Sequence, residues 1–201
     1  ITEARTRLQA LEQSYPPTYP PTYPPIVPPY GKLTDQQLYD RGHTEMTRGN
    51  FRNAVDYFDD LLRTYPSSYL ADDALLWKGK AWLEAREYRQ AIDALAQFRS
   101  RFAQSEQLPD AWYSLAWSEY QLGLKGYGDR VWLQRAGAEF AQFASRFGTH
   151  AWAAEALYMA GEAYERFGDL SSARSYWQQT IDRYPYTAFA GKAREKLNGY
   201  Y

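Results

Sequence analysis

A repeat constrains the fold of this 201-residue chain more than any other feature. Three sets of residues recur with successive separations of 37, 45 and 37 residues, and a fourth set recurs with separations of 37, 37 and 45. Agreement of four sets on one unusual spacing is the signature of a repeat architecture. The sets are Ala54, Ala91, Ala136 and Ala173; Tyr65, Phe102, Phe147 and Tyr184; Phe58, Leu95, Phe140 and Trp177; and Gly42, Gly79, Ala116 and Gly161.

Each unit has the pattern of two amphipathic helices joined by a tight turn, as in residues 38–66. Small residues such as Gly42 and Ala54 recur where a larger side chain would push the helices beyond the usual interaxial distance of ~8–10 Å. The proline of "TYP" closes the unit because it cannot continue a helix. Ser68 and Thr187 then suit the N-cap of the following helix. The third hairpin is eight residues longer, and its excess falls in 122–132, where three glycines indicate an enlarged turn.

These positions resemble the tetratricopeptide repeat over residues 35–190. The match is closest in the last unit, at Leu157, Gly161, Tyr164, Ala173, Trp177 and Pro185. It is partial elsewhere, since Ala103 and Gly148 stand where the closing proline would be. The resemblance implies an all-α, right-handed solenoid of four helical hairpins, ended by a polar capping helix over 187–198.

The stretch "YPxSxxAxxA" between units and the chain end "YPYTAFAGKAREKLNGYY" are similar to envelope proteins of Gram-negative bacteria. The first resemblance is to the cell-division coordinator of the Tol-Pal system. It implies a periplasmic location, partnership with TolA, and an N-terminal trimerising coiled coil before a linker and a repeat domain. Two features depart from that family: four repeat units in place of about three, and the enlarged third hairpin.

A second resemblance is to the tetratricopeptide lipoprotein of the outer-membrane barrel assembly machine. That family carries a lipidated cysteine at its mature N-terminus, and this sequence contains no cysteine.

Residues 1–13 predict a short amphipathic helix. Ile1, Ala4, Leu8 and Leu11 fit the a and d positions of two heptads, which indicates the end of a coiled coil and a homo-oligomer. Two heptads are marginal alone, because isolated helices below ~12–15 residues are unstable. The alternative is an amphipathic tail that lies on the solenoid.

Residues 14–33 form a linker rich in proline and tyrosine, in which "YPPT", "YPPT", "YPPI" and "VPPY" follow every four residues. Such a segment favours polyproline helix and would span on the order of 50 Å. The polyproline helix has three residues per turn, so tyrosines four residues apart spiral around it. This favours a spacer over a docking face. A rod that recognises a partner or packs back on the solenoid is the alternative. The repeat domain then occupies 34–201.

Composition excludes several functions. The 23 basic and 24 acidic residues nearly cancel, so we expect no nucleic-acid partner and at most a peripheral membrane contact. The two histidines, His43 and His150, have no metal-ligand spacing. No phosphate loop or nucleophile motif is present. We therefore expect neither a cofactor nor an enzyme.

The first helix of each unit is expected to line the concave face of the solenoid. Its inward positions are rich in aromatic groups, which are typical of binding hot spots. We predict that this groove binds a peptide segment or helix of a protein partner, as an adaptor in the periplasm. The alternatives are that the proline-rich rod covers the groove, or that the chain is a permanent subunit of a larger complex. The predicted binding residues are Tyr39, His43, Leu76, Lys80, Tyr113, Trp117, Tyr120, Tyr158 and Glu162.

Overall fold

The computed structural model describes residues 32–126 and 129–199. In these residues it contains nine helices and no strand. Eight of them form four hairpins, and the last closes the stack. They are α2 (Asp35–Arg48) with α3 (Phe51–Thr64), α4 (Ala71–Glu84) with α5 (Tyr88–Arg101), α6 (Leu108–Gly123) with α7 (Val131–Arg146), α8 (Ala153–Phe167) with α9 (Leu170–Arg183), and α10 (Ala188–Asn198).

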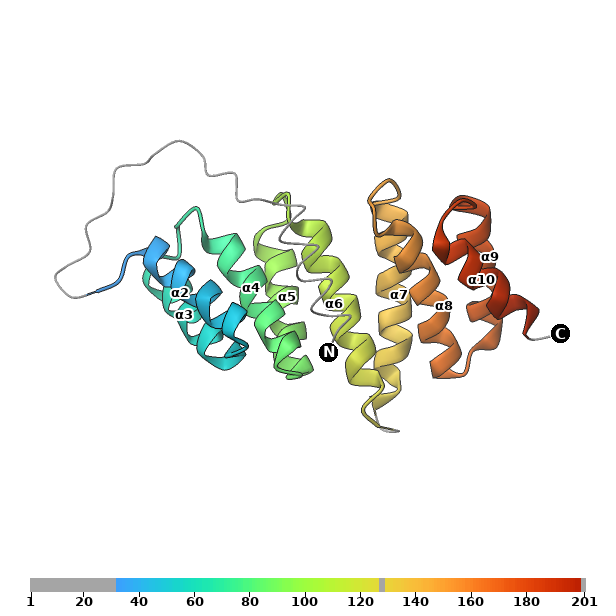
Figure 1. The fold of residues 1–201 in the computed structure, drawn as a ribbon, viewed down its shortest axis with the longest axis horizontal. Coiled ribbons are helices and arrows are strands. Elements are labelled where there is room, and N and C mark those ends of the chain that lie inside the picture. The colour runs from blue at the N-terminus through green and yellow to red at the C-terminus, as the bar shows by residue number, and fades with distance from the viewer. Residues whose placement is uncertain (1–31, 127–128, 200–201) are drawn as a thin grey trace.

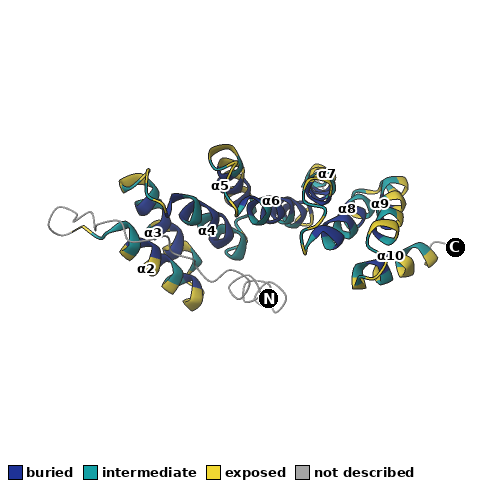
Figure 2. Cartoon of the chain, turned by 90° about the horizontal axis from the view of Figure 1, so that it is seen from above, coloured by how far each residue is buried: buried dark blue, intermediate teal, exposed yellow. Residues whose placement is uncertain are grey.

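The helices stand side by side in chain order, each packed on the next, and α10 lies on both α9 and α8 (Figure 1). Seen from above, the row curves, with α5 and α7 on its outer side and α8 and α10 on its inner side (Figure 2). This arrangement confirms the predicted solenoid of four hairpins. The predicted capping helix is also confirmed as α10.

Each hairpin is closed by a bulky side chain of its second helix against a small residue of its first helix. A Cβ atom added to Gly42 would lie 2.6 Å from the ring of Phe58, and one added to Gly79 would lie 2.6 Å from Cγ of Leu95. Gly161 meets Trp177 in the same way. The repeated alanines are all fully buried, and so are the four bulky residues. Two of the four repeated sets are therefore the two sides of one contact.

The second helix of every hairpin ends at the repeated aromatic position. The backbone of Tyr65, Phe102, Phe147 and Tyr184 leaves the helix with φ between −133° and −116° and ψ between 44° and 59°. This happens whether proline follows, as at Pro66, or not, as at Ala103. The proline is therefore not needed to end the helix.

The two predicted N-caps have different outcomes. Thr187 caps α10, and its side chain accepts a hydrogen bond from the backbone N–H of Ala190. The prediction for Ser68 is wrong, because α4 begins only at Ala71. The Ser68 hydroxyl instead accepts from the N–H of Leu70 and donates to Asp35, 2.6 Å away in the preceding hairpin. It fixes a turn between repeats.

The third hairpin is longer in its helices as well as in its turn. Helices α6 and α7 have 16 residues each, against 14 in α4 and α5. The rest of the excess lies in the turn between Gly123 and Val131. The third hairpin therefore extends farther than its neighbours on the lower side of Figure 1, where the turns between paired helices lie.

The predictions for residues 1–13 and for almost all of 14–33 lie outside the described residues. At the border, the backbone carbonyl of Leu33 accepts a hydrogen bond from the hydroxyl of Tyr65 over 2.8 Å. Thr34 begins α2 with a capping box, in which its side chain and that of Gln37 each accept from the other's backbone N–H.

Candidate partner-binding groove

An aromatic cluster occupies the inner side of the first two hairpins. The ring of His43 lies 4.5 Å from Tyr39 and 4.4 Å from Trp77, between centroids. Burial lowers the pKa of His43 to about 4, and the nearby charge of Lys80 acts in the same direction. His43 is therefore a neutral ring at physiological pH, held between two aromatic residues.

Lys80 links the second hairpin to the third. Its ammonium group is paired with the carboxylate of Asp110 at the start of α6 and lies 4.7 Å from the Trp77 ring centroid. Lys80 is 5% exposed, so most of its side chain is unavailable to a partner. Leu76 is 2% exposed and belongs to the core of the second hairpin.

In the third hairpin, Trp117 stacks on Tyr120 with 5.7 Å between ring centroids. Trp117 is half-buried, whereas Tyr120 is buried. Tyr113 is also buried, with its ring against Phe140, Phe143 and Trp152. Of the three predicted residues in this hairpin, Trp117 presents the most surface on the inner side.

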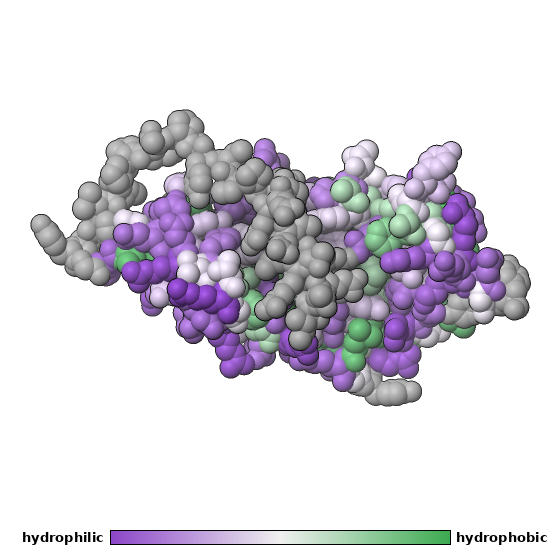
Figure 3. All heavy atoms as spheres, viewed as in Figure 1, coloured by the Kyte–Doolittle hydropathy of each residue, from purple (hydrophilic) through white to green (hydrophobic). Residues whose placement is uncertain are grey.

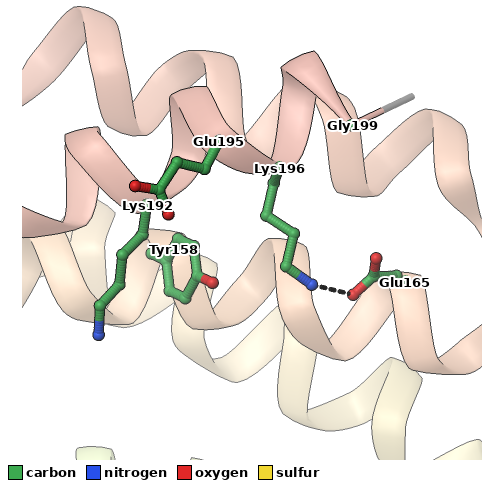
Figure 4. A pocket seen from close by; sticks show the side chains of 6 residues that line it. All are labelled: Tyr158, Glu165, Lys192, Glu195, Lys196 and Gly199. Carbon is green, nitrogen blue, oxygen red and sulfur yellow. Dashed lines mark hydrogen bonds and ion pairs between the residues drawn. The ribbon is translucent and has the colours of Figure 1, made fainter. Parts of the chain in front are cut away.

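In the fourth hairpin the capping helix completes the predicted surface. Lys196 of α10 lies 2.7 Å from Glu162 and 2.6 Å from Glu165, so its ammonium group joins two carboxylates of α8. Burial, and then Glu162, raise the pKa of Tyr158, whose hydroxyl stays protonated. Tyr158 forms one wall of an open cavity of about 570 Å³ between α8 and α10, which Lys192 and Glu195 also line (Figure 4).

The nine predicted residues thus separate by exposure. Four are half-buried, namely His43, Trp117, Tyr158 and Glu162. Five are buried, namely Tyr39, Leu76, Lys80, Tyr113 and Tyr120. Binding of a partner by these residues stays a prediction.

Sequence reasoning missed three residues that contact the predicted ones, namely Trp77, Asp110 and Lys196. Trp77 was not among the inward positions, although it follows Leu76 and meets His43 directly. Asp110 and Lys196 were missed because their importance comes from partners in other hairpins. A signal existed for Trp77: it lies one helical turn before Lys80, which is the spacing of neighbours on a helix surface.

Two further properties concern what the described residues contain. None of their helices is long and apolar enough to cross a membrane. They also hold no group of three or more His, Cys, Asp or Glu side chains arranged to bind a metal ion.

Residues 32–199 match the YfiO family model, described as an outer membrane lipoprotein. The chain belongs to this family. The match covers residues 34–199 of the predicted repeat domain and agrees with the resemblance of the sequence to envelope proteins. The second family that the sequence resembles, the tetratricopeptide lipoprotein of the outer-membrane barrel assembly machine, is also a lipoprotein family. No curated protein matches the sequence.

Solved structures with the same fold include other tetratricopeptide proteins. MamA has a TM-score of 0.57 and 21% identity, over 78% of this chain and 84% of its own. PilW, a type IV pilus biogenesis factor, has a TM-score of 0.61 and 22% identity, over 79% of this chain and 66% of its own. YrrB, titled a TPR protein with an unusual peptide-binding site, has a TM-score of 0.60 and 19% identity, over 80% and 74%. At these identities the likeness establishes the fold.

Proposed function

We propose that the protein is a non-enzymatic adaptor of the bacterial cell envelope, which binds a segment of a protein partner along the inner side of its solenoid. The observation that carries the proposal is that the first helix of each hairpin holds a half-buried aromatic residue, namely His43, Trp77, Trp117 and Tyr158. Aromatic side chains give large contact area at low entropic cost and dominate binding energy in protein interfaces.

Membership of an outer membrane lipoprotein family supports the envelope location. YrrB, which has the same fold, is described as a TPR protein with an unusual peptide-binding site, and this supports a peptide segment as the ligand. The five buried residues of the predicted set would act by holding the aromatic surface in place. Lys80 is an example, because its bond to Asp110 fixes the second hairpin relative to the third.

The adaptor can be tested by photo-crosslinking in cells. A photoreactive amino acid at His43, Trp117 or Tyr158 should crosslink to a defined partner. The same group at Gln97 or Gln142, exposed on the outer helices α5 and α7, should not. Equal crosslinking from the outer positions would contradict a groove on the inner side.

The identity of the crosslinked protein also decides the finer proposal. A link to cell division through the Tol-Pal system predicts TolA in the products from the inner positions. A permanent structural subunit predicts crosslinks from both the inner and the outer positions, together with loss of the protein from cells that lack its partners.

A further inference from the structure

The half-buried rings of His43 on α2 and Trp77 on α4 form an aromatic patch where the first two hairpins meet. Their centroids lie 4.4 Å apart. His43 is neutral at physiological pH, because burial lowers its pKa to about 4. Its Nε2 atom is buried and has no hydrogen-bond partner among the described residues. The aromatic patch therefore presents two uncharged rings.

The charged side chains one helical turn from the aromatic patch are already engaged. On α2, Asp40 accepts a hydrogen bond from a glutamine of the same helix. On α4, Asp73 accepts a hydrogen bond from Gln107. Lys80 is paired with Asp110. In Figure 3 the surface of the first two hairpins, at the left, is mainly hydrophilic, so the aromatic patch is a local feature. It suits a short apolar segment without charge.

The chain enters the first hairpin beside this patch. The carbonyl of Leu33 accepts a hydrogen bond from Tyr65, and its side chain packs on the core of the first hairpin. Thr34 then caps α2, and His43 lies nine residues farther, about 14 Å along the helix axis. About five residues of extended chain cover that distance. Gly31 stands just before this anchor, and glycine permits the sharp turn that would direct the preceding segment back along α2.

The preceding segment has the matching chemistry. Residues 13–31 contain eight prolines, four tyrosines and no charged residue. Proline-rich segments bind aromatic surfaces well, because their extended conformation is formed in advance and little entropy is lost on binding. Two aromatic side chains can be contacted by a single Tyr-Pro-Pro unit. Tyrosines that spiral around a proline-rich rod therefore do not prevent binding to a patch of this size.

We propose that residues 15–30 bind the aromatic patch of their own chain, and that a partner segment reaches the patch only by displacing them. A short tether holds a segment at an effective concentration in the millimolar range, which a partner in solution must exceed by its affinity. The segment thereby regulates access to the first two hairpins. The inference rests on the proposed function, because it assigns a regulator to the same site.

Photo-crosslinking within the purified 201-residue chain tests the binding. A photoreactive phenylalanine derivative at Tyr19 or Tyr23 should crosslink to the peptides of α2 and α4 that contain His43 and Trp77, as mapped by mass spectrometry. The same group at Gln97, exposed on α5, should not crosslink to residues 15–30. If half of the chains carry ¹⁵N, crosslinks within one chain join peptides of the same isotope only.

Variants on both sides of the contact sharpen the test. His43→Ala with Trp77→Ala should lower the crosslinking yield at least ~5-fold, as loss of a binding hot spot does. A second measurement leaves the described helices unchanged. Tyr15→Ser, Tyr19→Ser and Tyr23→Ser together should shift the indole N–H resonance of Trp77.

The matched control is the resonance of Trp132, which is also half-buried but lies on α7 and should not move. In cells, the three serine substitutions should raise the yield of partner crosslinks from position 43 at least ~5-fold, because the tethered competitor is removed.

Absence of crosslinks to α2 and α4 from both probe positions would overturn the proposal, as would an unmoved Trp77 resonance. Crosslinks that join different isotopes would assign the contact to a second copy of the chain instead. Failure of the proposed function is distinguishable, because the purified chain contains no partner. Intact crosslinks within the chain, without partner crosslinks in cells, would overturn the function and leave the segment bound to the patch.

Discussion

The distance between the two helices of a hairpin is set where one bulky side chain packs against a glycine. Leu95 contacts the backbone at Gly79, and Phe58 does the same at Gly42. Protein cores are close-packed, so even one added methyl group is felt at such a point. At Gly42 and Gly79, glycine allows a bulky side chain to approach the helix backbone closely. At Gly49 and Gly168, it allows a positive φ.

Gly79→Ala is expected to destabilise the fold by about 1–3 kcal/mol, because the new Cβ would lie 2.6 Å from Cγ of Leu95. Gly191→Ala is the matched control, since a Cβ there meets nothing within 4 Å inside helix α10. The control should stabilise by ~0.5–1 kcal/mol through helix propensity. Urea denaturation of both variants measures this, and equal effects of the same sign would contradict the packing argument.

Two buried ionisable residues make stability depend on pH in opposite directions. Glu119 of α6 is fully buried, with Arg135 2.8 Å away and with Glu139 and Arg99 also near it. Burial raises the pKa of Glu119 from 4.5 to about 7, against the opposing charge of Arg135. Between these values the folded state holds a proton that the unfolded state has lost, so stability falls as pH rises from 4.5 to about 7.

For His43 the sign is reversed. Its pKa is lowered from 6.5 to about 4, so the unfolded state binds a proton that the folded state refuses. Stability therefore falls as pH decreases from 6.5 to about 4. At ~1.4 kcal/mol per pKa unit, each effect amounts to at most roughly 3 kcal/mol. In the wild type the two largely offset each other over the shared range.

Single variants should expose the two slopes. Relative to wild type, Glu119→Gln should gain stability progressively as pH rises from 4.5 to 7.5. His43→Gln should gain progressively as pH falls from 6.5 to 4.5. Urea denaturation at several pH values gives the difference from wild type, in which all other titrating groups cancel. A difference that does not change with pH would contradict the assignment for that residue.

Among the elements, the turns between paired helices vary most from hairpin to hairpin. The first and fourth hairpins use Gly49 and Gly168 in the left-handed region, the second uses Arg86, and the third has a longer turn. A non-glycine residue in this region costs ~1–2 kcal/mol. The second turn therefore holds strain that the first and fourth avoid.

Arg86→Gly should stabilise the protein by ~0.5–1 kcal/mol, after the larger chain entropy of unfolded glycine is deducted. The reciprocal change, Gly49→Ala, should destabilise it by about 1 kcal/mol, because φ is 77° while no atom lies within 4 Å to clash. Thermal unfolding of the two variants measures both. A loss of stability in Arg86→Gly would mean that the arginine side chain makes contacts that outweigh its backbone strain.

On the scale of the whole molecule, each hairpin depends on its neighbours. Residues that are far apart in sequence but one repeat apart in space join the units, as Lys80 joins Asp110 and Lys196 joins Glu162. Helix α10 covers the last hairpin, where Ala190 and Ala193 are fully buried and Trp177 lies beneath. In a solenoid such contacts reach only the adjacent units.

Removal of residues 188–201 should therefore act locally. Amide hydrogen exchange should speed up in α8 and α9, which lose their cover and the Lys196 ion pairs, while α2 to α5 should keep their protection. Mass spectrometry of exchanging peptides measures this. Equal loss of protection in every hairpin would show that the stack unfolds as one cooperative unit.

The sequence by itself determined the repeat, the two-helix unit, the small residues at the helix crossings and the capping helix. These follow from short-range periodicity and from steric limits at single positions, both of which are visible in the residues. Tertiary structure decided which inward residues keep exposed surface. A first helix contacts its own partner and the hairpins on both sides, so Leu76 and Tyr113 are buried while Trp117 is half-buried. It also decided that Glu119 lies in the core, because burial depends on how successive hairpins stack.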